Sequence, residues 1–256
     1  MSAVDKKELE TKVKEMYRAV AQNPNGEFHF EMGRKLAEKL GYPTSDLDQL
    51  PREAIDSFAG VGYYFDLANI QEGEHVLDLG SGSGMDVFFA ALKVGPSGKV
   101  VGVDMTDAQL EKAEVLRTQG EFQRVSFRKG YIEALPFQDA QFDVVVSNGV
   151  INLSPEKEKV FQELSRVLKP GGRLAVSDII SREELPEGVT CDATLWASCI
   201  GGAMQIDRYE AAIEGTGLCL VTVRENPRYQ FLSSSAFTFS LKLFPATNLG
   251  TFLASI

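Results

Sequence analysis

The sequence predicts an α/β fold built on a doubly wound, mostly parallel sheet, with a helical extension at the N-terminus. From residue 74 onward, short apolar runs alternate with amphipathic stretches, which is typical of strands and helices that follow each other in a parallel sheet. One apolar run ends in an acid and three alternating glycines, in the segment Val76-Leu77-Asp78-Leu79-Gly80-Ser81-Gly82-Ser83-Gly84. Such a run predicts a buried strand whose C-terminal turn leaves its backbone open to a ligand.

The apolar runs give the strands, and apolar residues at helical spacing give the helices. Strands are expected at 75–79, 99–103, 124–128, 142–147, 172–178 and 218–224. Helices are expected between them at about 84–93, 107–117, 156–168 and 206–215. Stop signals such as Lys169-Pro170-Gly171-Gly172 support these limits. Six strands with four helices suit a doubly wound fold.

The residues before the sheet are expected to be helical. Val13, Met16, Tyr17 and Val20 recur at helical spacing within residues 4–20, and further helices are expected at 32–40 and 53–58. The chain is therefore divided into a helical extension, residues 1–70, and a main domain, residues 71–230. A tail, residues 231–256, is rich in Phe, Ser, Thr and Leu, and the sequence assigns it no structure.

Composition narrows the classes of partner. Lys and Arg number 26 against 36 Asp and Glu in 256 residues, and the net charge of -10 would repel a nucleic-acid backbone. No apolar stretch is long enough to span a bilayer and no charged-then-apolar leader is found, so a cytoplasmic protein without a membrane partner is expected. A monomer or a homodimer is expected.

The cysteines indicate thiols rather than disulfides or a zinc site. Cys191, Cys199 and Cys219 are odd in number, and a reducing compartment keeps them as thiols. There is no CxxC or HExxH pattern, and the chain has only two histidines, His29 and His75. No structural metal site is expected.

The spacing of the glycines indicates which class of ligand the turn can bind. Gly80, Gly82 and Gly84 follow a G-x-G-x-G pattern, whereas G-x-G-x-x-G is the pattern that seats a pyrophosphate on a helix N-terminus. The carboxylate of Asp78 would repel phosphate but accept hydrogen bonds from an ammonium group. The turn therefore favours a ligand without phosphate, although a tight turn with no ligand is the alternative.

A second acidic residue, Asp104, follows the next predicted strand. The run Val100-Val101-Gly102-Val103-Asp104 places Asp104 24 residues after Gly80, the length of one strand-helix-strand unit. An acid there can accept both hydroxyls of a ribose, and its alternative role is to cap a helix from Thr106 onward. S-adenosylmethionine carries a ribose and an ammonium group and has no phosphate, so it is the ligand that these residues predict.

Two segments are expected to cover the adenine. Met105 follows the second acid, and Gly130-Tyr131-Ile132-Glu133-Ala134-Leu135-Pro136-Phe137 follows the third strand, at the sheet edge where ligands collect. The alternative is that Met105 and Ile132 are ordinary core residues.

Asn148 is expected at the end of the fourth strand beside the sulfonium of the donor, where an amide positions substrate or backbone. Its alternative is a turn residue that bonds its own backbone. Methyl transfer needs little acid-base machinery because the sulfonium is already activated, so the scarcity of histidines does not oppose it.

With these residues in place, the chain resembles the class I S-adenosylmethionine-dependent methyltransferases, which have a Rossmann-like fold. The segments that carry the resemblance are Val76–Gly84, Asp104-Met105-Thr106, Gly130-Tyr131-Ile132-Glu133, Ser147-Asn148-Gly149-Val150-Ile151-Asn152-Leu153 and Leu168-Lys169-Pro170-Gly171-Gly172. The likeness runs from about Ser57 to Arg224. It implies that the donor is bound by Asp78, Gly80, Ser81, Gly82, Asp104, Met105, Tyr131, Ile132 and Asn148.

A narrower segment resembles the arsenite methyltransferase group, whose arsenic site is made of three cysteine thiolates. This segment is Leu195-Trp196-Ala197-Ser198-Cys199-Ile200-Gly201-Gly202-Ala203-Met204. Cys199 matches one of the group's cysteines, whereas Val61 and Gly149 stand where the group has the other two. Cys191, eight residues before Cys199, is the weaker candidate for a second thiol.

The sequence therefore predicts an S-adenosylmethionine-dependent methyltransferase of the arsenite methyltransferase type that acts on a small molecule. Asn148 and Cys199 are its expected catalytic residues, and they face the acceptor. The alternatives are an organic oxygen, nitrogen or carbon acceptor without arsenic activity, and a binding module for adenosyl ligands without turnover. The glycine spacing and Asp78 disfavour a nicotinamide dehydrogenase.

Overall fold

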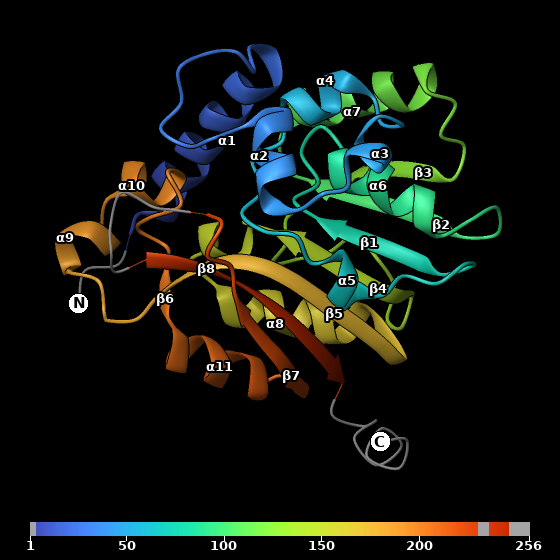
Figure 1. Ribbon diagram of the computed structural model, residues 1–256. Helices are drawn as coiled ribbons and strands as arrows, with labels where there is room; N and C mark the ends of the chain where they lie inside the picture. The colour runs from blue at the N-terminus through green and yellow to red at the C-terminus, as the bar shows by residue number, and fades with distance from the viewer. Residues whose placement is uncertain (1–3, 230–235, 246–256) are drawn as a thin grey trace.

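One mixed sheet organises the residues that the computed structural model describes, which are 4–229 and 236–245. Its strands run in the order β3-β2-β1-β4-β5-β8-β7, and the short β6 pairs with β5 (Figure 1). The strands are β1 (His75–Leu79), β2 (Lys99–Asp104), β3 (Val125–Lys129), β4 (Phe142–Asn148), β5 (Leu168–Ser181), β6 (Met204–Gln205), β7 (Leu218–Glu225) and β8 (Ala236–Pro245). Strand β8 runs antiparallel to both of its neighbours, β5 and β7.

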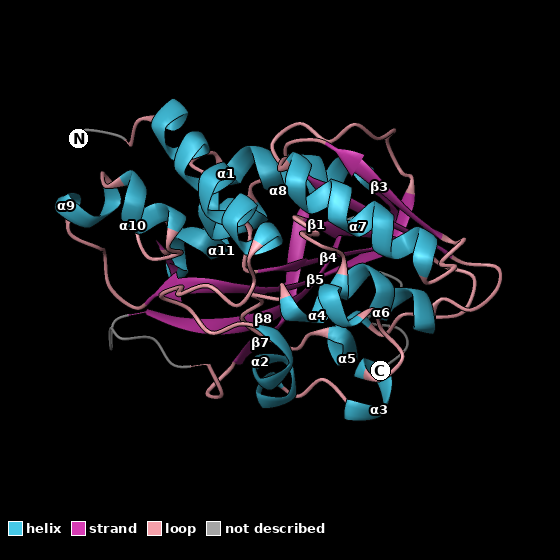
Figure 2. Ribbon diagram, turned by 90° about the horizontal axis from the view of Figure 1, so that it is seen from above, coloured by secondary structure: helices cyan, strands magenta, loops and turns pink. Residues whose placement is uncertain are grey.

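The helices cover both faces of this sheet (Figure 2). The α-helices of the N-terminal part are α1 (Lys6–Gln22), α2 (Gly33–Leu40), α3 (Thr44–Leu47), α4 (Arg52–Asp56) and α5 (Phe65–Ala68). Those that follow are α6 (Met85–Lys93), α7 (Asp107–Gln119), α8 (Lys157–Val167), α9 (Glu187–Thr190), α10 (Ala193–Ala197) and α11 (Ile206–Glu214), and a 3₁₀ turn, η1, spans Ile151–Leu153.

Alternate side chains of β1 pack against the two layers of helices. Val76 packs with Phe88 and Phe89 of α6 and with the N-terminal helices, whereas Leu77 packs with Phe161 of α8 and Ile213 of α11. All six are essentially inaccessible to solvent. An apolar run buried on both faces is what a central parallel strand requires, since helices cover it on either side.

The site is positioned by the carboxyl ends of β1, β2 and β4. Leu79 is in register with Val103 of β2 and with Ser147 of β4, so the turns that follow these three strands meet at one edge. β1 is the strand at which the chain order reverses, and ligands of doubly wound sheets bind at this switch point. Helix α1 lies beside the same edge and contacts α7 and α10.

The predicted fold class is confirmed, and the strand predictions fall close to the observed limits. β5 begins earlier than predicted, at Leu168, which pairs with Phe142 of β4. The short elements α3, α5, α9, α10 and β6 were not expected, because two to five residues give no readable period. In the tail, residues 236–245 form β8, and residues 231–235 and 246–256 lie outside the described part.

Candidate functional site

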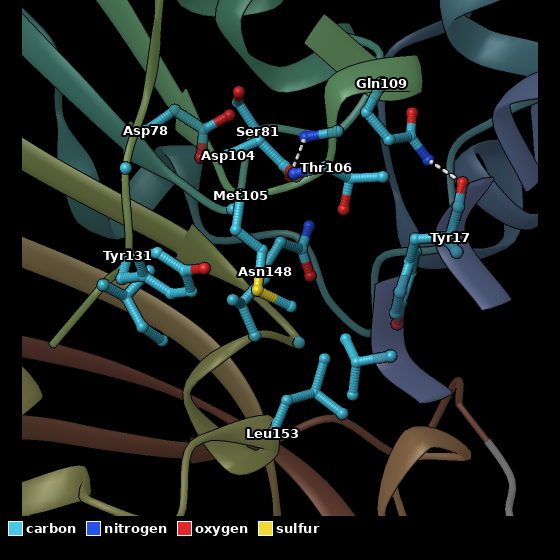
Figure 3. Close-up of a pocket in the computed structure, with 18 of the residues that line it drawn as sticks. Tyr17, Asp78, Ser81, Asp104, Met105, Thr106, Gln109, Tyr131, Asn148 and Leu153 are labelled. Carbon is cyan, nitrogen blue, oxygen red and sulfur yellow. Dashed lines mark hydrogen bonds between the residues drawn. The ribbon is translucent and has the colours of Figure 1, made fainter. Parts of the chain in front are cut away.

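A cavity of about 500 Å³ opens at the switch point of the sheet. All nine residues expected to bind the donor line it, namely Asp78, Gly80, Ser81, Gly82, Asp104, Met105, Tyr131, Ile132 and Asn148. Figure 3 shows most of their side chains arranged around one space, with Tyr17 and Leu153 on its far side. Cys199 and Cys191 are not among the residues of the cavity wall.

The glycine turn has a backbone that other residues rarely adopt. Gly80 and Gly82 have φ values of 62° and 52°, in the left-handed region that favours glycine. A Cβ atom at Gly80 would lie 2.5 Å from both methyl carbons of Val150, another residue of the cavity wall. The turn therefore needs glycine both for its conformation and for the close approach of the segment after β4.

Asp78 is a buried carboxylate that faces the cavity with its hydrogen-bonding capacity unused. It is 2% exposed, and no group of the described residues donates a hydrogen bond to it. Burial raises its pKa well above the usual value, and the charges of Asp86 and Asp104 raise it further. The hydroxyl of Ser81 is also buried without a partner in the described residues. Two unpaired polar groups in one cavity wall point to a ligand that supplies the partners.

Asp104 uses part of its carboxylate to hold the turns around it. One oxygen accepts a hydrogen bond of 2.9 Å from the backbone N–H of Gly82, and the other accepts one of 2.8 Å from that of Thr106. The capping role considered for this acid is thus present in part. A carboxylate accepts about four hydrogen bonds, so capacity remains for ligand hydroxyls. Burial raises the pKa of this carboxyl.

Asn148 lies in the cavity wall, but its amide is engaged with the protein. Its Oδ1 accepts from the backbone N–H of Val61 at 2.8 Å, and its Nδ2 donates to Asp86 at 3.0 Å and to the Tyr42 hydroxyl at 3.1 Å. The Tyr64 hydroxyl also donates to Asp86. The amide therefore positions backbone, as one of the expected roles states, and it fixes the loop before α5 against the donor side of the cavity.

Helix α1 supplies a wall that the sequence did not assign to the site. Leu9, Val13 and Tyr17 line the cavity from one face of this helix. Their helical spacing was readable in the sequence, yet it only indicated an apolar face and could not reveal what that face covers. Tyr131 meets the same helix, since its hydroxyl donates to Glu10 at 2.7 Å.

Comparison with known proteins agrees with this geometry. A family model described as a methyltransferase domain matches residues 70–217, which is more than half of the chain. An arsenic(III) S-adenosylmethionine methyltransferase from Chlamydomonas reinhardtii has a similar structure, with a TM-score of 0.63 and 31% identity, covering 83% of this chain and 73% of that chain. This chain belongs to the class I S-adenosylmethionine-dependent methyltransferases. Within them it is of the arsenite methyltransferase type.

Curated relatives of this methyltransferase point the same way. The arsenite methyltransferase of Halobacterium salinarum is 40% identical over 187 residues, which are 73% of this chain and 48% of that protein. The human arsenite methyltransferase is 42% identical over 153 residues, which are 56% of this chain and 41% of that protein. The chain thus spans about half the length of these relatives. A geranyl diphosphate C-methyltransferase from Streptomyces coelicolor shares the fold, with a TM-score of 0.66 at 16% identity.

Val61, Gly149 and Cys199, the three positions that the resemblance assigns to the arsenic site, lie close together, and only Cys199 carries a thiol. A Cβ atom at Gly149 would lie 3.1 Å from Cγ1 of Val61, and Val61 and Cys199 belong to one apolar cluster with Ile179 and Ala203. The Cys199 thiol lies behind Tyr17, with 3.7 Å between its Sγ and the Tyr17 hydroxyl oxygen. Burial raises the pKa of Cys199 to about 12, so it is a thiol at neutral pH.

Cys191 ends the short helix α9 and is half-buried, away from the cavity wall. Three aromatic residues that lie outside the cavity wall pack against other elements. Tyr63 and Phe65 pack in the aromatic cluster around Phe89, and Trp196 packs against α1. Helix α1 and the segment after β4 form a further part of the cavity wall.

Proposed function

We propose that this chain transfers the methyl group of S-adenosylmethionine to a small-molecule acceptor. The observation that carries the proposal is Asp78, a buried carboxylate without a protein partner among the described residues, at the edge of a cavity whose floor is bare glycine backbone. A dinucleotide would bring phosphates to this acid, whereas the amino-acid end of S-adenosylmethionine brings an ammonium group. The family to which the chain belongs supports the same donor.

Each residue of the cavity has a proposed role toward the donor. Asp78 would bind the ammonium group, and Asp104 would accept the ribose hydroxyls with the capacity left by Gly82 and Thr106. Met105 and Ile132 would cover the adenine, because both line the cavity on the β2 and β3 side. Bound S-adenosylmethionine supplies an activated methyl group on a sulfonium centre.

The chain's own contribution is alignment and exclusion of water. Asn148 would hold the loop at Val61 beside the sulfonium, because its Oδ1 accepts a 2.8 Å hydrogen bond from the backbone N–H of Val61. Helix α1 covers the cavity with Leu9 and Val13, which are 2% and 3% exposed. A dry, shaped cavity favours attack by the acceptor over reaction with water.

Isothermal titration calorimetry with S-adenosylhomocysteine tests the donor site. We expect one site per chain, with weaker binding by the Asp78→Asn variant. The decisive comparison uses NADH, since tight NADH binding without S-adenosylhomocysteine binding contradicts the proposal. Binding of the adenosyl ligand with no methyl transfer to any acceptor in a product screen would make the chain a binding module.

Arsenite is the second candidate acceptor. The names of the relatives favour it, and so does the convergence of Val61, Gly149 and Cys199 at one place. A single thiol is a weak ligand for a soft centre that prefers several thiolates. Formation of methylated arsenic by the purified protein, lost in a Cys199→Ser variant, would establish this activity.

The remaining proposals concern binding partners, oligomeric state and cellular location. We take the acceptor to be the only kind of partner, since the net charge of -10 opposes nucleic acid, and we expect a monomer or a homodimer. In residues 4–229 and 236–245, every helix is too short or too polar to cross a bilayer. We propose a cytoplasmic location, because the three cysteines form no disulfide within the described residues.

A further inference from the structure

The acceptor side of the cavity is apolar. On the β4 side of the switch point, the walls are Leu9 and Val13 of α1, together with Val150 and Leu153 of the segment after β4. Tyr17 closes this side, and Figure 3 shows Tyr17 and Leu153 facing the same space. We call these five residues the acceptor chamber. An apolar chamber selects an acceptor with a hydrocarbon body.

The chamber holds no side chain able to take a proton at neutral pH. Burial raises the pKa of Tyr17 well above its usual value, with Cys199, Tyr229 and Asp104 adding to the shift, so the phenol stays a donor. The thiol of Cys199 behind it is protonated for the same reason. Neither of the two histidines lines the cavity.

The glutamates of the cavity wall are engaged with other groups. Glu10 accepts from Lys14 and from Tyr131, and Glu133 accepts from Ser154. Glu156 pairs with two lysines at the rim, Lys6 and Lys159. The nucleophile therefore has to ionise without a base from the chamber. An alcohol does not do so at neutral pH. An ammonium ion and a thiol both release a small fraction of their protons, but the thiolate is the stronger nucleophile and it alone brings the negative charge that cancels the charge of the sulfonium.

Resting on the proposed function, we infer that the acceptor is a small apolar thiol, held in the acceptor chamber with its sulfur beside the phenol of Tyr17. The phenol O–H donates a hydrogen bond to the thiolate. This position lies next to Cys199, where the family gathers sulfur, but here Val61 and Gly149 replace the other protein thiols. The acceptor brings the sulfur that the protein lacks.

The reaction balances without any further group. The acceptor thiol releases its proton to bulk water, and a lone pair of the thiolate forms the new sulfur–carbon bond to the methyl group. The bond between the methyl carbon and the donor sulfur breaks, and its electron pair stays on that sulfur, giving S-adenosylhomocysteine. One negative and one positive charge become two neutral thioethers, so an apolar, water-excluding chamber favours the transfer.

The test uses three probes with one hydrocarbon body, benzyl mercaptan, benzyl alcohol and benzylamine, together with arsenite. The full chain is incubated with S-adenosylmethionine, and methylated products are measured by mass spectrometry. We expect benzyl methyl sulfide to form at least about 10-fold faster than the ether, the N-methylamine or methylated arsenic. A faster reaction of any other probe, or no S-methylation by protein that binds S-adenosylhomocysteine, overturns the inference. Protein that fails to bind S-adenosylhomocysteine contradicts the proposed function instead.

A Tyr17→Phe variant tests the position of the sulfur. Loss of the phenol donor is expected to lower kcat/KM for benzyl mercaptan about 10-fold, the size of one hydrogen bond to a charged group. It is also expected to move the acidic, rising limb of the pH profile to higher pH, because the bound thiol loses the group that favours its thiolate. The matched control is Tyr63→Phe, which lies outside the cavity wall. A profile that does not move contradicts the contact between Tyr17 and the sulfur.

Discussion

The Nε2 of Gln109 donates a 2.9 Å hydrogen bond to the backbone carbonyl of Tyr17, and so connects α7 to α1. The Oε1 of the same side chain accepts from the hydroxyl of Ser83, in the glycine turn. Gln109 is 2% exposed, and it lines the cavity. One buried amide thus links the turn proposed to bind the donor with the helix that closes the acceptor chamber.

A Gln109→Ala variant is expected to loosen α1. Both hydrogen bonds disappear and leave buried partners behind, which costs about 1–3 kcal/mol of the free energy of unfolding for each group left unpaired. Urea unfolding measures that loss, and hydrogen exchange of the α1 amides measures the local opening. Gln119→Ala on the same helix, at an exposed position, is the control. Unchanged exchange in α1 would show that the link does not hold the helix.

Asp78→Asn separates ligand binding from stability. Removing a charge that interacts with the donor ammonium is expected to weaken S-adenosylhomocysteine binding about 10-fold or more. The same change removes a buried charge near Asp86 and Asp104, so the free protein is expected to unfold at the same or a higher urea concentration. Calorimetry and urea unfolding give the two quantities. A variant that loses both affinity and stability would indicate a structural role.

The raised pKa of Asp78 also predicts a pH dependence of binding. The folded-state pKa lies above 3.8, so as the pH falls through the raised value the carboxylate takes up a proton and loses its attraction for the ammonium group. Affinity for S-adenosylhomocysteine is therefore expected to fall with pH in this window, whereas the free protein gains stability from the same protonation. Calorimetry from pH 8 downward measures the slope, and Asp78→Asn should flatten it.

Two glycine-to-alanine variants separate the cost of a strained backbone from the cost of a steric contact in the glycine turn. Gly80→Ala places a methyl group 2.5 Å from both methyl carbons of Val150 at a φ of 62°, whereas Gly171→Ala meets nothing within 4 Å at a φ of 83°. Gly171→Ala is expected to cost about 1–2 kcal/mol from its backbone alone. Gly80→Ala should cost more and also weaken S-adenosylhomocysteine binding. If the two variants lose the same free energy of unfolding, the side chain of Val150 moves aside without an energetic cost.

The parts of the site that follow strands were predictable, because strand ends and turn glycines are local signals. Asp78 and Asp104 were found in this way, and the cavity contains both. The contribution of Tyr17 was not predictable, since it depends on where α1 packs, which is a long-range property. Cys199 was expected to face the acceptor; its thiol lies 3.7 Å from the hydroxyl oxygen of Tyr17, and Tyr17 rather than Cys199 is a residue of the cavity wall. Sequence similarity finds the residue but does not give its surroundings.

The last prediction concerns arsenite binding, because Val61 and Gly149 stand where thiols would be needed to bind it. Trivalent arsenic is a soft centre that binds several thiolates, and this chain has one thiol, Cys199, at the three converging positions. Arsenite is therefore expected to leave the melting temperature of the natural protein unchanged in the presence of S-adenosylhomocysteine. The double variant Val61→Cys with Gly149→Cys should gain a concentration-dependent stabilisation by arsenite.

The double variant has a cost that the experiment must include. Gly149 has a φ of 73°, so a side chain there is strained by about 1–2 kcal/mol, and the unliganded variant is expected to melt below the natural protein. The measured quantity is therefore the shift that arsenite causes within each variant. Adding Cys199→Ser to the double variant should remove that shift, because a third thiolate is lost. Stabilisation of the natural protein by arsenite would instead mean that one thiol suffices, and the acceptor would be the metalloid rather than an organic thiol.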